Sequence, residues 1–158
     1  MIILAVIHKR FPVPLDKLLA LGKISDRFAV LDVSIPTEAD SVTFVAETLQ
    51  KFFDENGISK KNAYISAICM EKIAADYLAH RKSSGKPGKK SYMDIKAFCD
   101  DGRIELILRN YDVPYNPLVF ENDDETFAKI GVTMVQKVAE DITYSYSYHL
   151  NIVSITIA

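Results

Sequence analysis

Residues 92–110 read YMDIKAFCDDGRIELILRN, and this stretch decides what kind of fold the chain can form. Its two halves, 92–99 and 103–110, alternate as strands do and are rich in residues that favour strands. The short segment Asp100–Gly102 between them is a strong signal for a hairpin turn. The sequence therefore predicts an antiparallel strand pair, and a fully parallel α/β sheet is not expected.

The segment before this hairpin predicts one strand and two helices. Residues 28–34 are rich in strand formers. Apolar residues then recur at helical spacing, which predicts a helix over about 37–56 with Thr37 as its cap. Gly57 is the stop signal expected just after a helix, and a second helix is predicted over about 59–80.

The segment after the hairpin completes a two-layer fold. A third helix is predicted over 125–141, and a final hairpin over 143–148 and 151–157 with its turn at 149–150. The basic stretch 81–91 is rich in glycine, proline and serine and predicts a loop. The resulting order β-α-α-β-β-α-β-β predicts an α+β sandwich, with an antiparallel or mixed sheet and helices on one face.

The composition is that of an ordinary globular domain. The chain has 158 residues, of which 49% are apolar and 25% charged, enough for a single domain with a real core. A formal net charge of −2 gives no field that would attract nucleic acid, so no nucleic-acid partner is expected. Cys69 and Cys99 are too few for a disulfide framework, which favours a reducing cytoplasm.

The N-terminal residues 1–26 are expected to be a stub and connector outside the domain, which would span 27–158. The stub begins MIILAVIHKR, whose apolar run is far shorter than the roughly 20 residues that cross a bilayer. Two interpretations remain open: a first strand of the fold, or the end of a transmembrane helix of a longer protein. The residues by themselves favour the strand.

Lys72, Asp76 and His80 fall on one stripe of the second predicted helix. One interpretation is an exposed ion pair between Lys72 and Asp76, with His80 near the helix C-terminus where a cation is favoured. The other interpretation is the wall of a site, on which the Asp76 carboxylate would offer an oxygen to Mg²⁺.

Two later stretches support the second interpretation. NYDVPYNP, at 110–117, is a turn directly after a strand, and AKIGVTMV, at 128–135, places Gly131 inside a helical pattern. A glycine there costs about 1 kcal/mol relative to alanine. Either close packing of the helix against the sheet or close approach to a ligand phosphate would justify it.

Taken in order, the three stretches resemble the nucleotide-binding boxes of the histidine-kinase-type ATPases (the GHKL, or Bergerat-fold, superfamily), and in particular its anti-sigma-factor serine/threonine kinases. The family's first box is Glu-x-x-x-Asn followed four residues on by His, and this chain has Lys72, Asp76 and His80 there. Its second box, Asp-Asn-Gly-x-Pro-Phe-x-Pro, is similar to residues 110–117. Of the glycines in its third box only Gly131 is present.

The resemblance implies a Bergerat-type two-layer sandwich that binds ATP or ADP with Mg²⁺, with Asp76 as the metal ligand. The nucleotide-binding positions that it implies are Lys72, Asp76, His80, Asn110, Asp112, Pro114, Gly131 and Thr133. In the family the glutamate acts as general base, whereas a lysine is protonated near neutral pH and cannot accept the proton. Lys72 therefore argues against catalysis, and an uncharged Asn110 would weaken adenine recognition.

We therefore expect a divergent ATP-binding regulatory domain with weak or no kinase or ATPase activity. The alternative is a protein-interaction domain that binds no nucleotide, in which Tyr111, Asp112 and Lys129 would fill the pocket. The expected partner is another protein or a second copy of the chain. The chain also resembles domains joined to transporters of the multidrug and toxin extrusion type. Such a fusion would make residues 1–10 the end of a membrane helix, so the resemblance favours that interpretation over a strand, and it would place the domain at the cytoplasmic face of the membrane.

Overall fold

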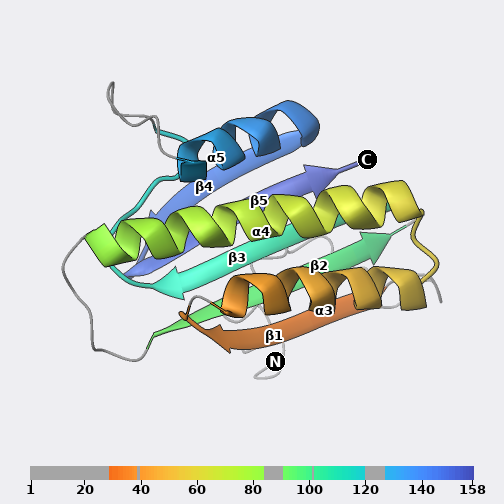
Figure 1. Ribbon diagram of the computed structural model, residues 1–158, viewed down its shortest axis with the longest axis horizontal. Coiled ribbons are helices and arrows are strands. Elements are labelled where there is room, and N and C mark those ends of the chain that lie inside the picture. The colour runs from red at the N-terminus through yellow and green to blue at the C-terminus, as the bar shows by residue number, and fades with distance from the viewer. Residues whose placement is uncertain (1–28, 39, 84–90, 101, 120–126) are drawn as a thin grey trace, which may run out of the picture.

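The part of the chain that the structure describes forms two layers, a five-stranded sheet and three helices that cover one face of it (Figure 1). The computed structural model describes residues 29–38, 40–83, 91–100, 102–119 and 127–158. Within these ranges the elements are, in chain order, β1 (Ala29–Pro36), α3 (Ser41–Glu55), α4 (Lys60–Ser83), β2 (Tyr92–Asp100), β3 (Arg103–Tyr111), α5 (Phe127–Val138), β4 (Asp141–Ser147) and β5 (Leu150–Ile157). The α+β class with helices on one face is confirmed.

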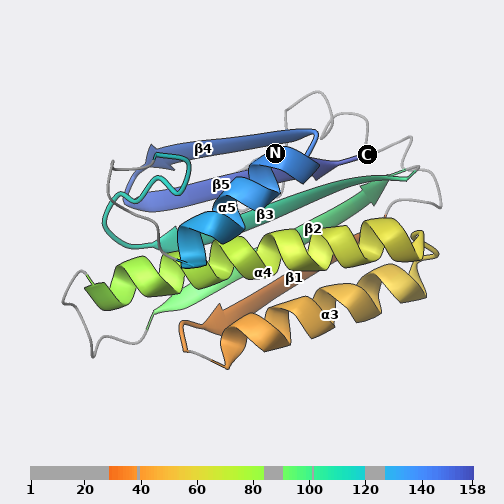
Figure 2. The ribbon, with the colours of Figure 1, turned by 45° about the horizontal axis from the view of Figure 1, so that its top comes forward.

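The sheet is antiparallel throughout, in the order β1-β2-β3-β5-β4. The predicted hairpin at its centre is confirmed, with Ile95 opposite Leu108 and Asp100 opposite Arg103. Gly102, in the turn, has a φ of +88°, which glycine adopts without the steric cost that a side chain adds. Neighbouring strands twist relative to one another, as Figure 2 shows.

The turn between β4 and β5 lies one residue earlier than predicted. Tyr148 and His149 both have positive φ, at 53° and 63°, while Leu150 already belongs to β5 and faces Ser147. A two-residue loop with both φ angles positive matches the twist of the strands that it joins. The burial of Val153 and Ile155 fixes the register of β5, so the turn has to precede Leu150.

The start of α3 also differs from the prediction. Thr37 is not its cap; its hydroxyl donates to the Ser91 carbonyl (3.1 Å) and so ties the end of β1 to the start of β2. The cap position is Asp40, whose side chain makes no capping hydrogen bond. At the other end Gly57, with a φ of +71°, stops the helix as predicted.

The long helix α4 is the centre of the helical layer. It lies between α3 and α5 and over the middle of the sheet (Figures 1 and 2). Its buried side chains, such as Cys69, Met70 and Ile73, belong to one core with Ile95 and Leu106 of the sheet. The helix continues to Ser83, three residues beyond the predicted end. Because α4 is covered from several sides, polar residues along it are buried too.

Charged residues are also buried on the other face of the sheet, opposite the face that α3, α4 and α5 cover. Lys96 is fully buried and its ammonium pairs with Asp32, and Arg109 lies 3.8 Å from Asp94. None of the helices within the described ranges is long and apolar enough to cross a membrane. The expectations for residues 1–26 and for most of the basic loop, 84–90, lie outside the described residues.

Candidate functional site

Asp76 is the centre of a buried polar cluster between α4, the turn after β3 and α5. Its side chain is 2% exposed, and the Tyr115 hydroxyl donates a hydrogen bond to its Oδ2. The Lys129 ammonium lies 3.5 Å from the same oxygen and donates to the Tyr115 hydroxyl at 3.0 Å. We call Asp76, Tyr115, Lys129 and His80 the Asp76 cluster. Its two buried charges compensate each other, which a buried charge requires.

His80 closes this cluster from the next turn of α4. Its ring stacks on that of Tyr115, with centroids 3.9 Å apart and planes 14° from parallel. The Lys129 ammonium lies 5.1 Å from the centre of the Tyr115 ring, within the range of a cation–π contact. Tyr115 is therefore held by the hydrogen bonds of its hydroxyl, by the stacked His80 ring and by the nearby Lys129 ammonium.

Asn151 holds the backbone of the turn that carries Tyr115. Its amide nitrogen donates to the Asn110 Oδ1 and to the Val113 carbonyl, both at 3.0 Å. Its oxygen accepts from the Tyr115 backbone N–H (3.0 Å) and from the Tyr144 hydroxyl (2.7 Å). The ordinary pKa of tyrosine lies well above neutral pH and burial raises that of Tyr144 further, so this hydroxyl is a donor. All the polar atoms of the Asn151 side chain amide are thus engaged.

Asp112 lies in a separate group at the C-terminal end of α4. Its carboxylate accepts from the Tyr77 hydroxyl (3.2 Å) and the Arg81 guanidinium (3.3 Å), and from the backbone N–H of Val113 at 2.9 Å. Burial is the largest cause that raises the pKa of Tyr77. Asp112 and Pro114 line an open cavity of about 880 Å³ at this end of the molecule.

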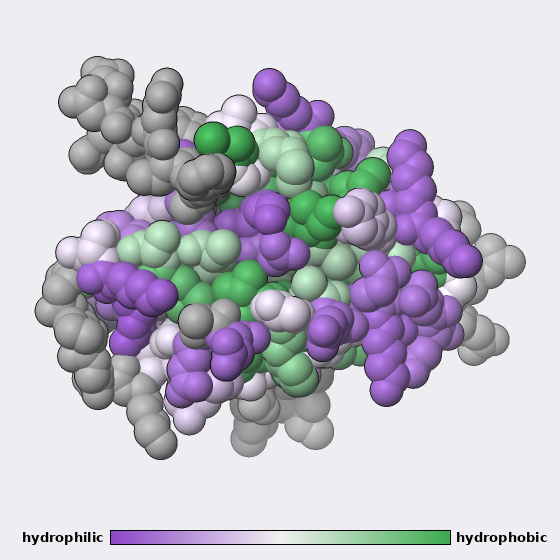
Figure 3. Space-filling view, viewed as in Figure 1, coloured by the Kyte–Doolittle hydropathy of each residue, from purple (hydrophilic) through white to green (hydrophobic). Residues whose placement is uncertain are grey.

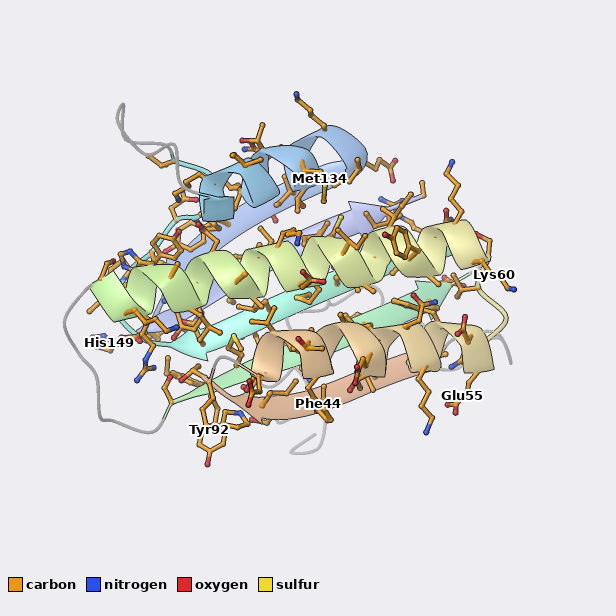
Figure 4. All side chains as sticks on the ribbon, in the orientation of Figure 1. Phe44, Glu55, Lys60, Tyr92, Met134 and His149 are labelled. Carbon is orange, nitrogen blue, oxygen red and sulfur yellow. The ribbon has the colours of Figure 1, made fainter. Side chains whose placement is uncertain are left out.

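Aromatic side chains form much of that cavity's wall. They are Tyr92, Tyr111, Tyr146 and His149. Figure 4 places the labelled Tyr92 and His149 at the same end of the molecule. Lys72, Asp76, Gly131 and Thr133 do not line this cavity, so the open space is not where the resemblance would put a nucleotide phosphate.

Lys72 and Gly131 contact each other, where α5 crosses α4. A Cβ atom added at Gly131 would lie 3.1–3.3 Å from the Cβ, Cγ and Cδ atoms of Lys72. The glycine is therefore explained by close packing, but of helix on helix and not of helix on sheet. The Thr133 hydroxyl donates to the Lys129 carbonyl (3.0 Å), a bond within α5.

The prediction of an ion pair between Lys72 and Asp76 is wrong. Lys72 pairs with its neighbour Glu71 (2.8 Å), and the partner of Asp76 is Lys129. The burial of Asp76 also rules out an exposed surface stripe. The cation that pairs with Asp76 comes from α5 and not from the same helix.

Of the side chains expected to fill the pocket, only Lys129 lies in the cluster. Tyr111 is 69% exposed, and Asp112 is bound by Tyr77 and Arg81. The sequence reasoning missed Tyr115 and Asn151. Asn151 did carry a signal, because it occupies a core-facing position in the alternating stretch NIVSITI, where a polar side chain must find partners.

A magnesium site at Asp76 stays a prediction. In the part of the chain that the structure describes, no three His, Cys, Asp or Glu side chains gather so that they could hold a metal ion. Magnesium bound with a nucleotide takes most of its ligands from phosphate and water, so one carboxylate could suffice if it were accessible. Here the carboxylate is buried and engaged.

No protein-family model and no curated protein matches this chain.

Proposed function

We propose that this chain is a catalytically inactive regulatory domain of Bergerat type, which acts by binding another protein. The fold part of the proposal is supported by the element order and by three helices on one face of an antiparallel sheet. It is also supported by the closeness of Asp76, the 110–117 turn and the start of α5, which are far apart in sequence. The partner would be a second protein, another copy of the chain or a fused transporter.

The observation that carries the proposal is that the Asp76 carboxylate already has its partners. A metal ion or phosphate at this position would need an accessible oxygen. Instead Oδ2 of Asp76 accepts from Tyr115 and pairs with Lys129 in a buried setting. Opening the cluster would leave two charges in need of new partners, which costs several kcal/mol.

Asn110, which was expected to bind adenine, also already has a hydrogen-bond partner. Asn110 is 3% exposed, and its Oδ1 accepts from Asn151. An adenine amino group would have to displace that hydrogen bond, whose loss leaves Asn151 with an unsatisfied donor. As they stand, the side chains do not fit a nucleotide with Mg²⁺.

Lys72 cannot serve as the general base in place of the family's glutamate. Its ammonium donates to Glu71 at 2.8 Å, so the nearest carboxylate is engaged with it. A protonated lysine cannot take a proton from an attacking hydroxyl. No phosphoryl transfer is proposed for this chain.

Isothermal titration calorimetry of the full chain with ATP and with ADP, each with and without Mg²⁺, tests this proposal. We expect no saturable heat, and no phosphate release above the buffer rate. Saturable Mg²⁺-dependent binding by the unmodified chain would contradict the proposal and support the nucleotide-binding regulatory domain instead. Turnover that survives Lys72→Ala would mean that another residue supplies the base and that Lys72 is not at the glutamate position.

A further inference from the structure

A groove runs between α3 and α4 on the surface of the helical layer, away from the Asp76 cluster. Its volume is about 520 Å³, and its apolar lining includes Ala46 of α3 and Ala67 and Ile68 of α4. The small alanine side chains leave room at the surface where the two helices lie side by side. Tyr64, also in the lining, is 62% exposed and so presents an aromatic ring to solvent.

The polar lining of the groove is strongly acidic. It carries four carboxylates, those of Glu47, Asp54, Glu55 and Glu71, against the single ammonium of Lys51. Lys51 and Glu55 lie 3.9 Å apart and both are well exposed, so solvent screens this pair. Glu71 is compensated by Lys72, whose ammonium lies 2.8 Å away, so the excess negative charge of the groove comes mainly from Glu47 and Asp54.

Figure 3 looks onto this helical face. Hydrophobic surface lies along the middle of the face, and hydrophilic side chains gather at the end where α3 finishes and α4 begins. Figure 4 places Glu55 and Lys60 at that end. An apolar floor bordered by hydrophilic side chains, with more carboxylates than ammonium groups in the groove lining, is therefore present on a single accessible face.

We propose that the α3–α4 groove binds a basic amphipathic helix of a partner protein. Such a helix would lay its apolar side chains against Ala46, Ala67 and Ile68 and place lysine or arginine side chains beside the carboxylates. A groove between two helices accepts the ridge of a third helix, and opposite charge fixes its orientation and raises its association rate. Nucleic acid would be repelled, because its phosphates carry the same sign as the groove.

This inference deepens the proposed function, because it names the surface and the chemistry of the partner. It uses none of the side chains of the Asp76 cluster. Calorimetry with nucleotides and titration with a peptide therefore report on the two proposals separately. Binding of both nucleotide and peptide would refute only the closed cluster, whereas binding of neither would refute only the groove.

The test uses a synthetic 14-residue helical peptide of leucine and lysine, and a matched peptide with glutamate in place of lysine. The ¹⁵N-labelled full chain is titrated with each peptide and followed by NMR, and affinities are measured by fluorescence anisotropy at low and raised salt. We expect the lysine peptide to shift the amide signals of Ala46, Glu47, Tyr64, Ala67 and Ile68, with weaker binding at raised salt. The glutamate peptide should leave them unchanged.

Variants locate the interaction. The double charge reversal Glu47→Lys with Asp54→Lys should raise the Kd for the lysine peptide at least tenfold. The control double variant, Glu38→Lys with Asp141→Lys, makes the same change in net charge at exposed sites outside the groove and should change the Kd less than twofold. Tyr64→Ala should weaken binding without changing its salt dependence, because it removes only apolar contact.

Three results would overturn the proposal. One is amide shifts spread over the whole surface, which would mean non-specific attraction. Another is equal weakening by the two double variants. The third is the absence of binding by the lysine peptide at concentrations where the unmodified chain stays monomeric.

Discussion

At the scale of single residues, Asp76 and Lys129 decide how the helical layer is held together. Both are nearly buried, and each is the other's charge partner. Breaking a buried pair by removing one member leaves an uncompensated charge, which costs about 3–5 kcal/mol. Each of the two charges therefore contributes to stability mainly while the other is present.

We expect Asp76→Ala and Lys129→Met each to lower the free energy of unfolding by about 3 kcal/mol or more. The double variant should lose less than the sum of the two, with a coupling of about 0.5–3 kcal/mol, because it leaves no unpaired charge. Urea denaturation measures all three. Lys51→Ala, which removes an exposed pair, is the control and should change stability by no more than about 0.5 kcal/mol. Additive losses at Asp76 and Lys129 would show that the two do not interact energetically.

Gly131 gives a second prediction, in which two opposing effects compete. Gly131→Ala gains about 1 kcal/mol of helix propensity but places a methyl group 3.1–3.3 Å from the side chain of Lys72. Because the Cβ of Lys72 is fixed to α4, we expect the clash to prevail and the variant to be destabilised. In a Lys72→Ala background the same change should cost clearly less, since Cγ and Cδ are gone. An equal cost in both backgrounds, measured by thermal unfolding, would contradict this account.

At the scale of elements, the β4–β5 hairpin carries local strain in its turn. Tyr148 and His149 both adopt left-handed backbone angles, which cost a non-glycine residue about 1–2 kcal/mol. The Tyr148 side chain is 94% exposed, so little packing compensates for this cost. Substitutions that relieve this strain should therefore raise the free energy of unfolding.

Tyr148→Asn combined with His149→Gly should raise the free energy of unfolding by about 1 kcal/mol, because Asn-Gly favours this turn. The urea midpoint is the measurement, and Ser147→Asn outside the turn is the matched surface control. A loss of stability would mean that the contact between His149 Nδ1 and the Tyr146 hydroxyl (3.3 Å) outweighs the backbone strain.

The elements also differ in how well the sequence predicts them. The central hairpin could be placed to within a residue, because alternation and turn chemistry act locally along 92–110. The burial of Asp76 could not be predicted, because helical spacing does not reveal how many neighbours cover α4. Tyr115 and Asn151 meet only through β-sheet register and a turn, which no local pattern fixes. The order of the elements was therefore predictable from the sequence, whereas the pairing of the buried polar groups was not.

At the scale of the whole molecule, the buried thiols link stability to alkaline pH. Burial raises the pKa of Cys69 and of Cys99 to about 11, above that of an exposed thiol. Between the two pKa values the unfolded chain loses these protons while the folded chain keeps them. Stability from this source is therefore complete below about pH 9 and is lost as the pH rises toward 11.

We expect the free energy of unfolding to fall by on the order of 1 kcal/mol per thiol between pH 8.5 and 10. Urea denaturation across this range measures the slope. The variant Cys69→Ala with Cys99→Ala will be less stable at every pH but should have a flatter slope. If its slope equals that of the unmodified chain, other groups, such as the buried Tyr77, cause the alkaline loss.

The position of β5 in the sheet has a consequence for how the chain is made. Although it is the last of the described elements in sequence, β5 lies between β3 and β4. A ribosome makes the other described elements first, so the second edge of β3 stays unpaired by β5 until residues 150–157 emerge. An exposed strand edge invites pairing with other chains. For this protein the interval after β3 and β4 have been made and before residues 150–157 emerge is therefore a period of raised aggregation risk, and a chaperone would act most usefully then.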